Sequence, residues 1–412
     1  MQLRELIVQR IRDEGPLPFA EYMDLALYHP ELGYYARADR RSGRAGDFLT
    51  SVDSGTAFGA LLARQFAEMW RLAAAGAAPA LVEAGAGSGR LARDVLDHLA
   101  ADCPDLYRTL RLTLVERSPA ARAAQAGTLG AHAARLAGAA TELPAGVRGV
   151  VFANELLDAL PVHPIVMTAD GLREVHVDRD GDRLVERLGP ASAAVRAHMA
   201  RFGIRLEPGW RVEVSPAAVA WVAAAARRLT RGFLVLIDYG HEARELYSPT
   251  HARGTLTCYR RHRAAVGGEG GAAAPWLAEP GACDITAHVD LTAVRTAAEQ
   301  AGLQTLAVLD QTYFLLALAA LRDGGEAPHP TASGQAPGWQ GATKEHIGHL
   351  RPGSNAGSRE AWPLDLGALR ERLALKTLLV PGGLGSTHKV LIFGRNVGTP
   401  SLQGCAFSRR AT

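Results

Sequence analysis

The sequence contains almost no lysine, only four cysteines and no long apolar run. Lys344, Lys376 and Lys389 are its only lysines, so nearly all of the 45 basic residues are arginine. The chain has 45 basic and 42 acidic residues, so its net charge is +3, and the two signs are interspersed along the sequence. This pattern indicates codon bias rather than an evolved nucleic-acid surface, so we expect no nucleic-acid partner.

The cysteines are far apart in the sequence, at Cys103, Cys258, Cys283 and Cys405. Without a C-x-x-C pair they predict neither a zinc site nor a disulfide framework, and scattered reduced thiols are typical of a cytosolic protein. Charges every few residues over Met1–Arg12 leave no apolar core of a signal peptide. No run approaches the ~20 apolar residues that cross a bilayer. We therefore expect a cytoplasmic protein with no membrane span and no metal.

Short apolar strands alternate with amphipathic helices from Ala80 onward. Strands are predicted at 80–84, 110–116, 149–153 and 233–238, with candidate final strands at 305–309 and 388–393. This alternation predicts an α/β fold, a doubly wound parallel sheet covered by helices on both faces. Apolar-polar alternation over 163–178, around Asp170-Gly171, predicts an inserted β-hairpin. The segment 264–275, rich in glycine and alanine, is predicted to be irregular.

Four segments are expected from this organisation. A helical N-terminal segment with a covering loop spans 1–75, and the core spans 76–321 with an insertion at about 162–230. A polar stretch rich in glycine, proline and serine over 322–363 predicts a flexible loop. A C-terminal helix and final strand follow over 364–412.

The sharpest local feature is the glycine turn Glu83-Ala-Gly85-Ala-Gly87-Ser-Gly89, between a strand and a helix. Glycines let the backbone approach a ligand, and the helix N-terminus supplies unpaired N–H donors. The dinucleotide fingerprint needs a third glycine where Arg90 stands. Glu83, close before the first glycine, would suit the amino group and sulfonium of S-adenosylmethionine. The alternative is a tight strand-to-helix connection without a ligand.

Further acids follow the next strands at the same predicted edge. Glu116 closes the second strand and is placed to accept both ribose hydroxyls, unless it is only a solvated strand-end carboxylate. Asn154 and Glu155 follow a later strand, and ligands bind outside the carboxyl ends of such strands. If the segment after it is helical, Glu155 and Asp158 share a face.

The pair Glu155 and Asp158 could orient a guanidinium and accept its proton during methylation. The alternative, which the spacing supports equally, is a solvated helix start whose acids favour the helix dipole.

Ordered motifs over residues 15–290 resemble the MidA family, which includes the mitochondrial complex I assembly factor regarded as a protein arginine methyltransferase. The matching motifs are Gly15–Met23, Tyr28–Tyr35, Gly46–Ser51, Val82–Gly89, Val115–Pro119, Asn154–Pro161, Glu213–Pro216, Ile237–Gly240 and Asp284–Asp290. The resemblance implies a class I, Rossmann-like methyltransferase fold with S-adenosyl-L-methionine on the glycine turn.

The resemblance also implies that the loop Gly46–Ser51 packs over the cofactor. Gly46, Thr50 and Ser51 are then expected as cofactor contacts. Asp47, which could bond ligand hydroxyls or amines, joins Glu155 and Asp158 as a candidate catalytic residue, although an Asp-capped turn is an equal alternative for it.

Two departures from the family pattern leave the substrate open. Ser51-Val52-Asp53 replaces the usual Ser-Pro-Glu, and Pro381–Ser386 replaces the expected Met-Gly. The leading hypothesis is a methyltransferase that acts on a protein by in-line displacement, with arginine favoured as acceptor and a respiratory complex I subunit as one candidate substrate. The alternatives are a non-catalytic cofactor-binding assembly factor, a small-molecule methyltransferase and a nicotinamide oxidoreductase. The oligomeric state is not predicted.

Overall fold

The computed structural model describes residues 2–36, 51–73, 78–260, 263–266, 274–320, 378 and 387–407. The flexible loop predicted over 322–363 lies outside these ranges, as do Gly46, Asp47 and Thr50. The helix expected before the last strand is described only at Leu378. Within these ranges, no helix has both the length and the apolar character that a bilayer crossing requires.

The main sheet is built largely from the predicted strands. Along the sheet the strands follow the order β4 (Leu136–Ala140), β3 (Arg111–Val115), β2 (Ala80–Ala84), β5 (Val147–Asn154), β10 (Leu229–His241), β16 (His388–Arg395) and β15 (Gln304–Asp310). The chain therefore passes from β2 to β3 and β4 on one side of β2, and then crosses to β5 on the other side. This change of direction creates the crevice at which ligands of doubly wound sheets bind.

One strand runs against the expectation of a wholly parallel sheet. The pairs from β4 to β10 are parallel, but β16 is antiparallel to both β10 and β15. The apolar run Val390–Phe393 is fully buried like the parallel strands beside it. Burial on both faces gives the same sequence pattern in either direction, so the pattern could not reveal the orientation.

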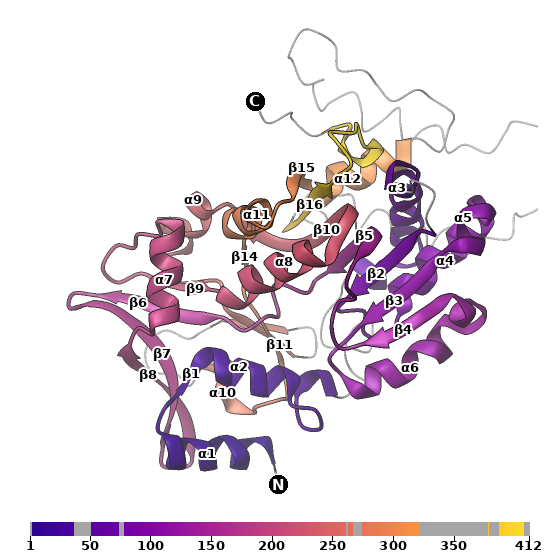
Figure 1. The fold of residues 1–412 in the computed structure, drawn as a ribbon. Helices are drawn as coiled ribbons and strands as arrows, with labels where there is room; N and C mark the ends of the chain where they lie inside the picture. Colours follow the sequence, from indigo (N-terminus) through magenta and orange to yellow (C-terminus); the bar gives the residue numbers. More distant parts are fainter. Residues whose placement is uncertain are drawn as a thin grey trace, which may run out of the picture.

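Helices cover both faces of the main sheet, as the α/β prediction requires (Figure 1). Val150 and Phe152 of β5 pack into the cluster of α3 (Ala57–Ala73), α4 (Arg90–Asp102) and α12 (Gln311–Ala320). The alternate residues Val151 and Ala153 pack against α8 (Pro216–Arg228) and α11 (Leu291–Gln300). This division follows from the two-residue repeat of a strand.

The helix after β3 begins at a capped turn. Ser118 caps α6 (Pro119–Leu129) by accepting a hydrogen bond from the Ala121 N–H at 3.3 Å, with Pro119 in the first turn. The shorter α5 (Pro104–Thr109) connects α4 to β3.

A second sheet is formed by strands that mostly follow β5 in the chain. The predicted hairpin is confirmed, since β6 (His163–Thr168) pairs antiparallel with β7 (Gly171–Asp180). The sheet is completed by β8 (Arg183–Pro190), β9 (Arg211–Val214) and the short N-terminal β1 (Leu17–Pro18), with α7 (Ala193–Phe202) between β8 and β9. It takes up residues 163–214 of the region predicted as an insertion, and α8 then packs on the main sheet.

A small third sheet joins the N-terminal helices to this unit. It contains β12 (Arg263–Val266), β11 (Thr257–Arg260) and β13 (Asp284–Thr286), so the segment predicted as irregular begins with a strand. Helices α1 (Leu3–Glu14) and α2 (Phe19–Tyr28), within the predicted helical N-terminal segment, share one apolar cluster with the second and third sheets. The Tyr28 hydroxyl donates to the Ala159 carbonyl at 3.0 Å, which brings this unit to the carboxyl end of β5.

Candidate functional site

The glycine turn after β2 leaves open space at its centre. Gly85 and Gly87 have φ angles of 69° and 53°, in the left-handed region that other residues rarely adopt. A Cβ atom at Gly87 would meet no atom of the described residues within 4 Å. The backbone therefore exposes an unobstructed surface beside the crevice between β2 and β5, a cradle that a larger side chain would fill.

Glu116 lies against this turn, as the sequence predicted. One of its carboxylate oxygens accepts a hydrogen bond from the Gly87 N–H at 2.9 Å, and the other accepts from the Ser118 N–H at 2.7 Å. The Gln125 amide donates to the Gly87 carbonyl at 3.0 Å. Each carboxylate oxygen keeps a further lone pair. Glu116 can therefore hold the turn and still accept a ligand hydroxyl, and its role toward ribose stays a prediction.

Glu83 was expected from the sequence to be negatively charged, but its surroundings in the structure favour the neutral form. Its side chain is 4% exposed, and burial raises the pKa of its carboxyl group to about 8. One of its oxygens has no hydrogen-bond partner among the described residues. At neutral pH burial therefore favours the protonated, neutral form of Glu83, and the nearby acids Glu116 and Asp94 add to this preference.

This shifted pKa predicts how stability depends on pH. The folded state holds a proton on Glu83 between its ordinary pKa of 4.5 and about 8, where the unfolded chain has released it. The free energy of unfolding therefore decreases as pH rises through this window. The thermal unfolding midpoint of the wild type should therefore fall from acidic to mildly alkaline pH. We expect this fall to be smaller in Glu83→Gln.

The matched control for this measurement is Glu142→Gln, whose side chain in the parent is 82% exposed. The control should keep the wild-type pH dependence. An unchanged pH dependence in Glu83→Gln would show that Glu83 does not carry the shifted pKa.

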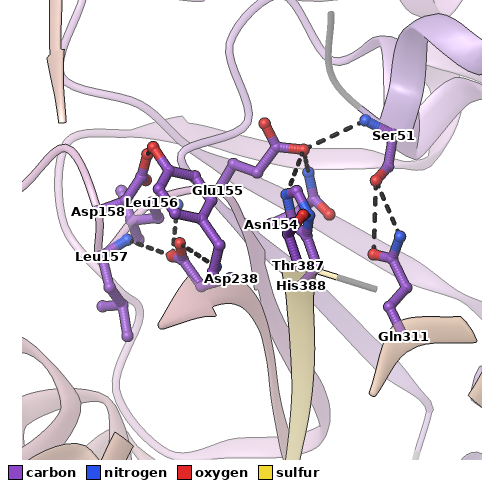
Figure 2. Close-up of polar contacts among 11 residues, drawn as sticks. Ser51, Asn154, Glu155, Leu156, Leu157, Asp158, Asp238, Gln311, Thr387 and His388 are labelled. Atoms are coloured by element: carbon purple, nitrogen blue, oxygen red, sulfur yellow. Dashed lines mark hydrogen bonds and ion pairs between the residues drawn. The ribbon is translucent and has the colours of Figure 1, made fainter. Parts of the chain in front are cut away.

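The end of β5 joins three separate parts of the chain (Figure 2). A Glu155 side-chain oxygen accepts hydrogen bonds from the Ser51 N–H at 3.2 Å and from the Asn154 amide at 3.3 Å. The same oxygen lies 3.5 Å from the His388 Nε2 atom, at the start of β16. The Ser51 hydroxyl is 3.1 Å from the Gln311 amide nitrogen, which donates to it. The end of the predicted covering loop is thus fixed at the crevice.

The backbone after β5 is a turn rather than the helix considered from the sequence. Glu155 has a φ of 51°, a strained value for a residue with a side chain. Asp238 stabilises the turn, because one of its oxygens accepts from the Leu156 and Leu157 N–H groups at 3.2 and 2.7 Å. The local spacing of Glu155 and Asp158 could not reveal this, since the partner lies on β10.

Four acids, three of them buried, gather beside this turn, and we call Glu155, Asp158, Asp238 and Asp284 the acidic cluster. Burial raises the pKa of Asp158 to about 6, and the nearby Glu155 adds to the shift. Burial also raises the pKa of Asp284 to about 8, with Asp158 as the next cause. Asp238 follows the same direction for the same reasons. The structure therefore places Asp158 near Glu155 within a larger group, but on a turn and not on the shared helical face considered from the sequence.

The hydrogen bonds of the acidic cluster distinguish its members. Both oxygens of Asp238 have protein partners, since the second oxygen accepts from the Tyr239 N–H at 2.9 Å. Asp284 accepts from the Tyr35 hydroxyl at 2.9 Å. Asp158 accepts from the Tyr239 hydroxyl at 2.5 Å, but its other oxygen is buried without a partner among the described residues. The side-chain oxygen of Asn154 is in the same situation.

These unsatisfied acceptors indicate what the site can do. Buried polar atoms without partners are rare, and each needs an explanation. Carboxylate and amide oxygens on the crevice side accept hydrogen bonds, so the arrangement suits a ligand rich in N–H donors and carrying positive charge.

No role was predicted from the sequence for Tyr35, Asp238, Tyr239, Asp284 or His388. The first four lie in motifs quoted for the family resemblance, but the pattern gave no spatial partner for any of them. Tyr239, for example, is 81 residues from Asp158 in sequence.

Comparisons with known proteins agree with this geometry. Residues 61–309 match the model of a family described as S-adenosyl-L-methionine-dependent methyltransferases. A crystal structure from Burkholderia thailandensis, bound to S-adenosyl-homocysteine, is 30% identical with a TM-score of 0.79, over 99% of this chain and 95% of that one. A second structure from that organism, at 30% identity, has a TM-score of 0.77 over the same shares of the two chains.

A mitochondrial relative from Bos taurus, named protein arginine methyltransferase NDUFAF7, is 32% identical over 76% of this chain and 72% of its own length. The Homo sapiens protein of that name is 29% identical over 75% and 71%. These relatives contradict the expected cytoplasmic location, because both are named as mitochondrial proteins.

Proposed function

The chain belongs to the MidA family of S-adenosyl-L-methionine-dependent methyltransferases, and from this premise we propose that it methylates a protein on the guanidinium group of arginine. The class I methyltransferase fold and the cofactor S-adenosyl-L-methionine come with that membership. The acceptor is the proposed part. The names of the mitochondrial relatives support it, and so does the chemistry of the acidic cluster.

The observation that carries the proposal is the buried oxygen of Asp158, which has no hydrogen-bond partner among the described residues and lies at the carboxyl edge of the sheet. A guanidinium group carries five N–H donors, no acceptor and a charge that persists above pH 12. It therefore needs anionic acceptors when it leaves water. Asp158 supplies one carboxylate oxygen as an acceptor. Glu155 lies beside it, and its side chain is 12% exposed.

We place the methyl donor over the glycine turn, where Gly87 leaves a cradle. In this proposal Glu83, Gly85, Gly87 and Gly89 form the floor. Glu116 accepts the ribose hydroxyls, and Asn154 uses its unpartnered oxygen toward a donor of the ligand. Ser51 closes the crevice, with Gly46, Asp47 and Thr50 of the preceding loop as further expected contacts.

The bound cofactor supplies an electrophilic methyl group on a sulfonium, whose thioether leaves with the electron pair of the broken bond. Asp158 would accept a hydrogen bond from the arginine nitrogen and orient its lone pair along the line of displacement. As the new nitrogen–carbon bond forms, the nitrogen loses a proton, and the Asp158 carboxylate is placed to take it. Asp238 would act indirectly, because its hydrogen bonds fix the turn that carries Glu155 and Asp158.

The test is to follow a radiolabelled methyl group from the donor into cell lysate. We expect label in protein, and acid hydrolysis should release it as methylarginine. Identification of the labelled band shows whether the substrate is a respiratory complex I subunit or another protein. Label in small molecules alone would contradict the proposal. Bound donor without any transfer would favour a non-catalytic assembly factor.

A further inference from the structure

Three histidines from separate segments meet at the end of β10. His241 ends that strand, His251 ends the short helix η4 (Pro249–His251), and His288 lies between β13 and β14 (Val289–Asp290). One ring nitrogen of each lies within 4.8 Å of the other two. The centroids of the His241 and His251 rings are 4.6 Å apart, and those of His241 and His288 are 5.1 Å apart. We call these residues the histidine cluster.

Glu245, in the one-turn helix α9 (Ala243–Leu246), orients two of the rings. His251 Nδ1 lies 2.9 Å from the Glu245 backbone oxygen, and His241 Nδ1 lies 3.1 Å from a Glu245 carboxylate oxygen. Both oxygens can only accept, so each Nδ1 carries the hydrogen. The Nε2 lone pairs of His241 and His251 are thereby left available, as in the carboxylate- and carbonyl-supported histidines of metal sites.

The third ring has a buried nitrogen, the His288 Nδ1 atom, with no hydrogen-bond partner among the described residues. The ring packs edge-on against Tyr239, with centroids 5.5 Å apart. A polar nitrogen withdrawn from water without a partner destabilises the folded state. A metal ion bound by the cluster would satisfy the His288 ring.

We propose that His241, His251 and His288 bind a divalent transition-metal ion, with Zn²⁺ as the expected ion. Imidazole ligands suit Zn²⁺, whereas Mg²⁺ and Ca²⁺ prefer oxygen. Zn–N bonds of about 2.0–2.1 Å place tetrahedral nitrogens about 3.4 Å apart, so small rotations of the rings complete the geometry. Three protein ligands leave the fourth position for water or another ligand.

This site lies beside the acidic cluster without belonging to it. Tyr239 packs against His288 on one side and against His388 on another, with centroids 5.5 and 5.4 Å apart, while its hydroxyl bonds Asp158. A metal would tie the end of β10 to the segments that carry His251 and His288. The function we assign to the metal is to hold these segments together, and this function does not depend on the identity of the methyl acceptor.

The test measures metal binding directly, with full-length protein that carries no polyhistidine tag. Protein stripped by a chelator is incubated with ZnCl₂, freed of unbound metal and analysed by mass spectrometry. We expect about one zinc per chain, and Co²⁺ in its place should give the intense visible absorption of a tetrahedral site. His251→Gln and His288→Gln should lose both signals. Glu245→Gln should weaken zinc affinity by about 10- to 100-fold.

The control is His98→Gln, in α4 and outside the histidine cluster, which should keep the zinc and the cobalt spectrum. Binding of S-adenosyl-L-methionine reports whether each variant is folded. If His288→Gln does not fold, the partly exposed His251 decides the result through its own variant. The proposal is overturned if the wild type retains no more zinc than His251→Gln, or if both variants keep the cobalt spectrum.

Discussion

Replacing Gly87 with valine is expected to weaken binding of S-adenosyl-L-methionine by about 100-fold. The Cβ position at Gly87 has no atom of the described residues within 4 Å, and we propose that the cofactor lies there. A branched side chain would fill the cradle beside the Gly87 N–H that bonds Glu116. Losing roughly 3 kcal/mol of contacts corresponds to about a 100-fold weaker affinity. Isothermal titration with the cofactor measures this loss.

Valine at Gly87 also strains the backbone, because its φ of 53° is left-handed. Such strain costs about 1–2 kcal/mol, so stability must be separated from binding. Gly146→Val is the matched control. Gly146 has a φ of 70° and equally open space, but it precedes β5 at the opposite edge of the sheet. If both variants bind the cofactor equally well, the cradle is not the cofactor site.

Replacing Asp158 with asparagine is expected to reduce methyl transfer by about 10²–10⁴-fold, the range typical of a lost general base. Asparagine keeps the size of the side chain and can still accept from the Tyr239 hydroxyl. It loses the charge that would hold a guanidinium and the ability to take a proton. Because the cofactor contacts lie elsewhere, affinity for S-adenosyl-L-methionine should change little. Single-turnover transfer and titration measure the two effects separately.

The pH profile gives a second readout for Asp158. Burial raises its pKa to about 6, and a base acts only when deprotonated, so the wild-type kcat/KM should rise with pH through that value. The rise should vanish in Asp158→Asn. Asp178→Asn, on β7 and with a side chain that is 17% exposed, serves as the control and should behave as wild type. Wild-type transfer by Asp158→Asn would remove Asp158 from the mechanism.

The fold was largely predictable because burial leaves a direct pattern in the sequence. Apolar runs such as Phe233–Asp238 marked the strands. The direction of β16 left no such pattern. Nor did β1, a two-residue strand whose Leu17 and Pro18 pair with β7 about 160 residues away. Its position depends on the packing of α1 and α2, which short-range periodicity does not encode.

The candidate site was predictable where its residues follow a strand. Gly87 and Glu116 end adjacent strands, so sheet topology alone brings them together. Asp238 and Asp284 reach the acidic cluster from other strands, through tertiary hydrogen bonds that local spacing does not reveal. The histidine cluster shows the same limit. Its members are separated by intervals of 10 and 37 residues, unlike the short spacings of recognisable metal motifs.

The most direct test of the account is a crystal structure of the protein bound to S-adenosyl-homocysteine. We predict that the nucleoside lies between Gly87 and the end of β5, with its ribose hydroxyls within hydrogen-bond distance of Glu116 and its sulfur facing Asp158. A nucleoside bound elsewhere, or a crevice filled by protein side chains in the complex, would contradict the account.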